Sequence, residues 1–185
     1  MKKLFIVLCF SSFLLSFSQE KDIPNFNKNE IKGNALFLVI GSPEFTYERL
    51  LNEESGVGIT LGFALDQQFE TKFSLSPYYR FYFGKKPAAG FFVEGFGMFN
   101  SITIEDYTYS SSNYPYGSTY NTYVKGESYS DFAVGFGIGS KWVTKKGFLF
   151  EINAGVGRNL INSEKNDFYD HTYVGKFGLT MGYRF

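Results

Sequence analysis

Residues 172–185 read TYVGKFGLTMGYRF, and every second residue of this stretch is large and apolar. The residues of that parity are mostly aromatic or aliphatic: Tyr173, Phe177, Leu179, Met181, Tyr183 and Phe185. Alternation with period two separates side chains onto the two faces of a β-strand, because successive side chains point in opposite directions. The stretch therefore predicts a strand with one strongly aromatic face.

The rest of the chain divides into similar runs. Seven further stretches alternate wholly or in part, at residues 31–41, 44–51, 56–65, 72–84, 90–99, 131–143 and 148–157. The run at 31–41 alternates only at its start and then becomes apolar on both faces. An aromatic content of 21% and 20 glycines also favour strands over helices. We predict an all-β fold, an eight-stranded antiparallel up-and-down barrel, because such a set can close without leaving exposed edges.

Side-chain size indicates which face lies inside. A soluble barrel puts its apolar set inside, whereas a membrane barrel turns that set outward to lipid. The apolar set here is bulky, and the other set is mainly Gly, Ser, Thr and Ala with single charges. An eight-stranded barrel is only just wide enough to hold side chains, so the smaller set fits the interior. A tilted strand over residues 173–185 rises about 28–30 Å, which matches a hydrocarbon core. We therefore predict a transmembrane β-barrel.

The links between the predicted strands are of two kinds. Those on the side of the termini are short, at residues 52–55, 84–89 and 144–147, and the opposite side carries a long stretch at 101–128. Short periplasmic turns and longer external loops are typical of outer-membrane barrels. We assign residues 30–185 to the barrel, 101–128 to a long external loop, and 19–29 to a periplasmic leader.

Residues 1–18 have the pattern of a secretory signal peptide. Two lysines precede an uncharged run at residues 4–17, and Ser16 and Ser18 suit cleavage before Gln19. The single cysteine, Cys9, lies in this segment, so the mature chain would have no thiol for disulfides or metal binding. Without the two lysines, 16 basic residues (18 minus 2) face 18 acidic ones, a net charge of −2. Because there is no basic block, we expect no nucleic-acid partner. The expected location is the outer membrane.

Two segments resemble a known family. Residues 29–61, NEIKGNALFLVIGSPEFTYERLLNEESGVGITL, and residues 77–99, PYYRFYFGKKPAAGFFVEGFGMF, carry the likeness. They are similar to a family of small, uncharacterised outer-membrane barrels of Gram-negative bacteria, catalogued only as a domain of unknown function. The resemblance implies the location and a small barrel of the OmpA or OmpX type, and it implies no activity.

Several charged residues fall on the inward parity. They are Glu48, Lys72, Arg80, Glu94, Glu151 and Lys176. Opposite charges that face one another across a narrow lumen form either an ion or proton path or a structural plug. We favour the plug, because a buried charge in a packed barrel needs a partner and pairing alone accounts for the set.

The external loop is the most distinctive region of the sequence. Six tyrosines lie there among Ser, Thr, Asn and Gly: Tyr107, Tyr109, Tyr114, Tyr116, Tyr120 and Tyr123. Antibody paratopes use this mixture for adaptable contact. Both arms alternate, so we predict a hairpin that turns near residues 113–117 and projects beyond the membrane. An extracellular ligand is one hypothesis for its role, and a solvated loop under pressure to vary is the other.

The last strand also suggests an assembly signal. A terminal aromatic preceded by alternate aromatics resembles the tag that the barrel-assembly machinery recognises, which gives this role to Tyr183 and Phe185. We expect outer-membrane lipid and that machinery as partners, and a monomeric protein.

Enzymatic chemistry finds little support in the sequence. His171 is the only histidine, and its neighbours Asp170 and Thr172 would point to the opposite face of a strand. We expect no cofactor and no metal. The leading hypothesis is a non-enzymatic barrel with a structural or surface-interaction role. Two alternatives remain open: a narrow pore for small or hydrophobic solutes, and an outer-leaflet lipid-modifying enzyme.

Overall fold

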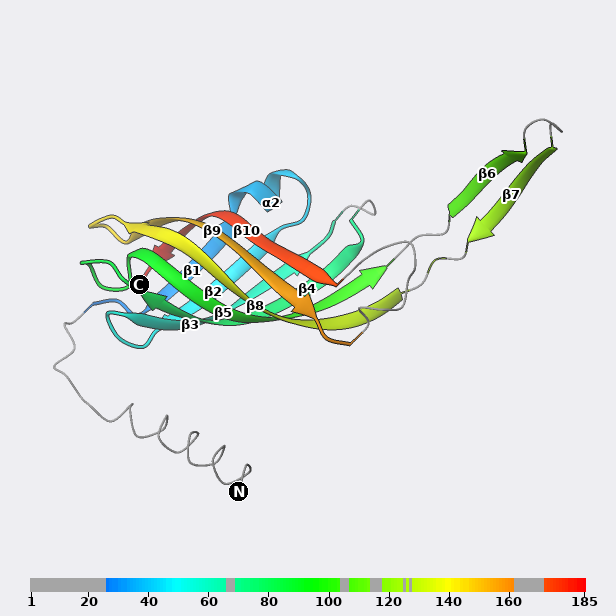
Figure 1. The fold of residues 1–185 in the computed structure, drawn as a ribbon. Coiled ribbons are helices and arrows are strands. Elements are labelled where there is room, and N and C mark those ends of the chain that lie inside the picture. Colours follow the sequence, from blue (N-terminus) through cyan, green and yellow to red (C-terminus); the bar gives the residue numbers. More distant parts are fainter. Residues whose placement is uncertain are drawn as a thin grey trace, which may run out of the picture.

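The computed structural model describes residues 26–65, 69–103, 107–113, 118–124, 126, 128–161 and 172–185. Eight strands form a closed barrel (Figure 1). These are β1 (Asn29–Asn34), β2 (Glu44–Leu50), β3 (Ser55–Phe63), β4 (Thr71–Tyr82), β5 (Gly90–Thr103), β8 (Ser128–Val143), β9 (Phe148–Asn159) and β10 (Tyr173–Arg184). A short helix, α2 (Ala35–Val39), follows β1, and β6 (Tyr107–Asn113) and β7 (Ser118–Val124) form a separate two-stranded sheet.

The barrel strands pair in the order β1-β10-β9-β8-β5-β4-β3-β2, and every pairing is antiparallel. Neighbouring strands follow one another in sequence, with the β6–β7 hairpin inserted between β5 and β8 and with β1 and β10 closing the ring. The prediction of an eight-stranded antiparallel up-and-down barrel is therefore confirmed. The seam is held at its end by two backbone hydrogen bonds that Asn29 and Phe185 exchange, 3.1 and 2.8 Å long.

The predicted first strand is wrong in its second half. Residues 35–39 form the helix α2 where we expected the strand to continue. Leu36 and Ala35 favour a helix, and this apolar tract has no alternation to hold one of its faces against the lumen. Leu38 and Val39 remain exposed, at 62% and 85%.

The two ends of the barrel differ. At one end, which we call the terminal end, lie the start of β1, the end of β10 and the short turns between β2 and β3, β4 and β5, and β8 and β9 (Figure 1). At the other end, the hairpin end, β6 and β7 extend away from the ring of strands (Figure 1). No helix in the described part of the chain is long and apolar enough to cross a membrane.

Candidate functional site

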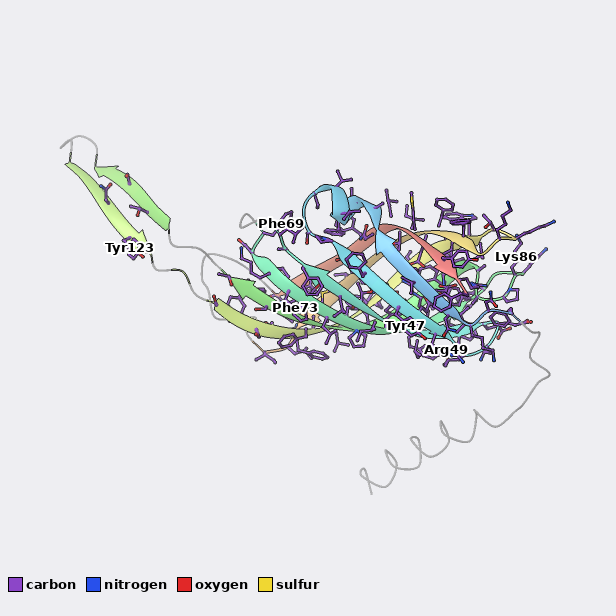
Figure 2. All side chains as sticks on the ribbon, turned by 180° about the vertical axis from the view of Figure 1, so that it is seen from behind. Tyr47, Arg49, Phe69, Phe73, Lys86 and Tyr123 are labelled. Atoms are coloured by element: carbon purple, nitrogen blue, oxygen red, sulfur yellow. The ribbon has the colours of Figure 1, made fainter. Side chains whose placement is uncertain are left out.

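Charged side chains line the inside of the barrel, and apolar side chains cover its outside. The buried charged residues include Glu30, Lys32, Glu48, Arg80, Glu94, Lys141, Glu151 and Arg184. The exposed large apolar residues include Phe45, Ile59, Phe81, Phe136, Phe150, Phe177 and Met181. Figure 2 shows side chains projecting outward around the barrel, with Tyr47 labelled among them. The alternate strand residues with large apolar side chains therefore face outward, as the sequence predicted. This is the arrangement that lipid stabilises.

Glu48 and Arg80 lie at the centre of the buried charges. Arg80 Nε donates to Glu94 Oε2 at 2.6 Å, and its Nη1 donates to Glu151 Oε2 at 2.8 Å and to Glu48 Oε2 at 3.3 Å. Lys32 pairs with Glu48 and with Glu151, the latter at 3.0 Å. These side chains come from five strands, so the ion pairs connect opposite walls of the barrel.

Two tyrosines of β4 complete the environment of Glu48. Tyr78 OH donates to Glu48 Oε2 at 3.0 Å, and Tyr82 OH donates to Glu48 Oε1. The Arg80 guanidinium lies between two rings, 4.4 Å from the centroid of Tyr78 and 4.2 Å from that of Phe92. A buried carboxylate is stable only when such donors replace water, and this one has five of them.

A second group of ion pairs closes the terminal end. Lys141 Nζ donates to Glu30 Oε2 at 2.8 Å, and Arg184 Nε donates to Glu30 Oε1 at the same distance. Arg184 also donates through Nη1 and Nη2 to the carbonyls of Pro87 and Ala88, both at 2.8 Å. The β4–β5 turn is thereby held across the mouth of the barrel by a side chain of the last strand.

On the hairpin side of the centre, Lys176 Nζ pairs with Glu94 Oε1 at 2.8 Å. We call the set Glu30, Lys32, Glu48, Arg80, Glu94, Lys141, Glu151, Lys176 and Arg184 the luminal ionic cluster. Each of its four glutamates contacts at least two of its five cations. The ion pairs of the cluster therefore connect the strands across the inside of the barrel.

Inward-facing glycines give the large luminal side chains their space. A Cβ added at Gly58 of β3 would collide with the ring of Tyr78, and one at Gly139 of β8 would collide with the ring of Phe92. The inward-facing glycines are therefore matched to bulky side chains of the directly paired neighbouring strands, Gly58 to Tyr78 and Gly139 to Phe92.

Five of the six predicted luminal residues lie in the cluster: Glu48, Arg80, Glu94, Glu151 and Lys176. Lys72 shares their parity and is half-buried, but it lies eight residues from Arg80, about 26 Å along β4. It therefore belongs to the hairpin end and not to the cluster.

Sequence reasoning missed four charged members: Glu30, Lys32, Lys141 and Arg184. Lys141 stood on the inward parity of its run, so alternation was a signal that could have found it. Glu30 and Arg184 are directly paired across the β1–β10 seam, and a seam of a closed barrel joins the two ends of the sequence. No local pattern marks such a pair.

The predicted hairpin is present, and its external location stays a prediction. β6 and β7 pair from Tyr107 with Val124 to Asn113 with Ser118, and Ser110 Oγ donates to Asn121 Oδ1 at 2.6 Å. Four of the predicted contact tyrosines lie on these strands: Tyr107, Tyr109, Tyr120 and Tyr123. Tyr123 is 62% exposed (Figure 2). Tyr114 and Tyr116 lie outside the described residues.

The two predicted assembly residues lie at the terminal end. Tyr183 faces outward and packs edge-on against Phe148 of β9, with ring centroids 5.4 Å apart. Phe185 also faces outward, beside the backbone pair that closes the seam. Their proposed recognition by assembly machinery stays a prediction.

Three further sequence predictions concern residues that the structure does not describe, wholly or for the most part. The signal peptide at residues 1–18, most of the leader and His171 lie outside the described residues. Within the described ranges, no group of three or more His, Cys, Asp or Glu side chains is arranged to hold a metal ion.

A closed, eight-stranded antiparallel barrel with an apolar exterior and a charged interior defines the class of transmembrane β-barrels. The chain belongs to the family described as "Protein of unknown function (DUF3575)", whose model matches residues 4–177. This confirms the resemblance that the sequence suggested.

A solved structure with a similar fold supports the assignment of the barrel. The barrel is similar to the N-terminal β-barrel domain of Pseudomonas aeruginosa OprF, with a TM-score of 0.53 and 17% sequence identity over 86% of this chain and 98% of that chain. At this identity the likeness shows the fold. No curated protein matches the chain.

Proposed function

We propose that the protein is a non-enzymatic barrel of the outer membrane that presents its β6–β7 hairpin at the cell surface. The observation that carries the proposal is the inverted distribution of side chains, with apolar residues outside and the luminal ionic cluster inside. A large apolar outer surface is stable when lipid surrounds it. A barrel that spans the outer membrane has one end in the periplasm and the other outside the cell.

The remaining parts of the proposal follow from this location. The segment 1–18 is the export signal, lipid surrounds the barrel, and the assembly machinery recognises the end of β10 through Tyr183 and Phe185. The protein acts as a monomer. Each strand of the closed barrel has a neighbour on both sides over most of its length, which leaves little free edge to pair with a second copy. The hairpin contacts an extracellular ligand.

The luminal ionic cluster favours this role over a pore or an enzyme. Its charged groups contact one another and the tyrosines of β4, so they are engaged in holding the walls together. A solute on a path through the lumen would have to separate these ion pairs, and each separated buried charge is costly.

Cysteine labelling on intact cells tests the location and orientation together. The mature chain is expected to contain no cysteine, so Tyr123→Cys introduces one reactive site on the hairpin. A membrane-impermeant maleimide added to intact cells should label this variant, because Tyr123 is exposed and would lie outside the cell.

Lys145→Cys is the matched control. Lys145 is also solvent-exposed but lies in the β8–β9 turn at the terminal end. It should react only after the outer membrane is broken, and the unsubstituted chain should not react at all. Labelling of Lys145→Cys but not of Tyr123→Cys in intact cells would reverse the proposed orientation, and labelling of neither would refute surface exposure.

A further inference from the structure

The wall of the barrel is incomplete between β10 and β2 near the hairpin end. β1 pairs with β10 from Glu30–Arg184 as far as Asn34–Thr180, and there the chain leaves the sheet to form α2. β10 continues against β9 as far as Tyr173. The segment 173–179 of β10 therefore has a strand on one side only, and α2 lies next to its other side (Figure 1).

The unpaired side of this segment presents backbone polar groups. Phe185 exchanges hydrogen bonds with Asn29, so alternate residues back from it, including Phe177, Gly175 and Tyr173, direct their N–H and C=O groups to that side. Among the described residues, one hydrogen bond reaches the edge from Tyr173 to Phe177, from Asn34 Nδ2 to the carbonyl of Phe177 at 3.2 Å.

A bare strand edge cannot face hydrocarbon. Non-helical backbone at membrane depth is tolerated only where it is buried in protein or lines a polar cavity. A cavity of 420 Å³ does lie against this edge. Its lining includes the lumen-facing residues Ser74, Asn100 and Lys176 and the outward-facing residues Phe37 and Phe177. Because residues of both faces line it at the unpaired edge of β10, the cavity reaches the gap in the wall beside α2, and we call this gap the lateral opening.

The polar groups around the cavity define its chemistry. Glu44 and Glu70 contribute carboxylates, and the ammonium of Lys176 is already paired with Glu94. Asn34 lies behind the lining, is 5% exposed, and its amide donates at 2.9 Å to Glu44, which does line the cavity. These carboxylates add acceptors and negative charge to the N–H and C=O groups of the open edge, which disfavours an anionic head group and favours one that donates hydrogen bonds.

We propose that the lateral opening binds a single-chain amphiphile from the outer leaflet, with a hydrogen-bond-donating head that carries no negative charge. The head occupies the cavity beside Glu44 and Glu70 and satisfies the open edge of β10. The alkyl chain leaves through the wall over Phe37 and Phe177, whose rings pack 5.1 Å apart at the opening. This inference rests on the proposal that the barrel spans a membrane.

Photo-crosslinking in liposomes tests the inference. The full mature protein is refolded into phosphatidylcholine vesicles with a diazirine-bearing dodecanol, and the labelled peptides are identified by mass spectrometry. Labelling at lipid-facing residues is the background of any membrane protein. Labelling at the cavity-lining residues Ser74 and Met98 is the expected specific result, and excess unlabelled dodecanol should abolish it.

Two outward-facing glycines supply matched variants. A Cβ at Gly175 or at Gly95 would meet no atom within 4 Å, so a larger side chain fits at either position. Gly175 lies at the lateral opening and Gly95 lies on β5 in the intact wall. Gly175→Leu should lower the labelling of Ser74 and Met98 by about tenfold, equivalent to about 1.4 kcal/mol of binding, and Gly95→Leu should leave it unchanged.

Three outcomes would overturn the inference. They are the absence of label at Ser74 and Met98 in the wild-type protein, equal labelling in Gly175→Leu, or equal labelling by a diazirine-bearing dodecanoate, which would contradict the assigned head group. If Gly175→Leu fails to fold, competition by unlabelled dodecanol in the wild-type protein still tests the inference. If the protein does not insert into vesicles, the proposed function fails; if it inserts without specific labelling, only this inference fails.

Discussion

At the scale of single residues, Glu48 shows how the lumen is organised. Its carboxylate accepts from Lys32, Arg80, Lys141 and the two tyrosines of β4, and it is completely buried. Buried ion pairs add little net stability compared with apolar packing, but removing one partner leaves a charge without compensation. The cluster therefore makes each of its members difficult to replace singly.

Arg80→Ala should strongly destabilise the barrel. The change removes the cation that contacts Glu48, Glu94 and Glu151, and the expected loss is about 3–5 kcal/mol of unfolding free energy. Urea unfolding in lipid vesicles, followed by loss of β-sheet circular dichroism, measures it.

Arg49→Ala is the control for this variant. Arg49 faces outward at the end of β2 and donates to Asn29 Oδ1 at an exposed position, so its removal should cost only about 0–1 kcal/mol. Equal unfolding free energies for the two variants would show that Arg80 is not a structural ion-pair residue.

At the scale of elements, the β6–β7 hairpin is separate from the barrel. Within the described residues its strands pair only with each other, whereas the barrel strands β5 and β8 pair directly along their length. The hairpin can therefore change without altering the wall, which suits a segment that contacts a variable partner.

Deletion of residues 107–124 should leave the barrel folded and abolish surface binding. Because the β5–β8 ladder is independent of the hairpin, the unfolding free energy should change by less than about 0.5 kcal/mol. Binding of cells that express the wild type or the deletion to glycan and extracellular-matrix arrays measures the functional part. Unchanged binding would remove the proposed surface-interaction role and leave the hairpin as a solvated loop.

At the scale of the whole molecule, the luminal ionic cluster lies between the two ends of the barrel. The luminal ionic cluster joins the walls at the centre, and Arg184 holds the β4–β5 turn over the terminal mouth. The cavity at the hairpin end is thus separated from the terminal end. We therefore expect no passage of solutes through the barrel.

The wild-type protein should be electrically silent in planar lipid bilayers. Ions would have to cross a region in which the charged groups are already paired, so no stepwise conductance is expected at moderate voltage. A protein-free detergent addition and a known large porin supply the negative and positive controls. Regular conductance steps from the purified wild-type protein would favour the alternative of a narrow pore.

The sequence by itself determined the number of barrel strands, the face each turns to lipid, and the presence of the hairpin. Alternation is a local property of the chain, because side chains on a strand change face at every residue. The same property identified Glu48, Arg80, Glu94, Glu151 and Lys176 as inward.

Only the tertiary structure decided which inward residues meet. Parity gives the face of a side chain but not its height along the barrel, which depends on strand tilt and stagger. Lys72 and Arg80 share a face and lie at different heights, whereas Glu30 and Arg184, 154 residues apart in the sequence, are hydrogen-bonded partners. The tertiary structure also decided where β1 ends and hence where the lateral opening lies. Residues 35–39 are apolar without alternation, so their sequence pattern does not specify a strand.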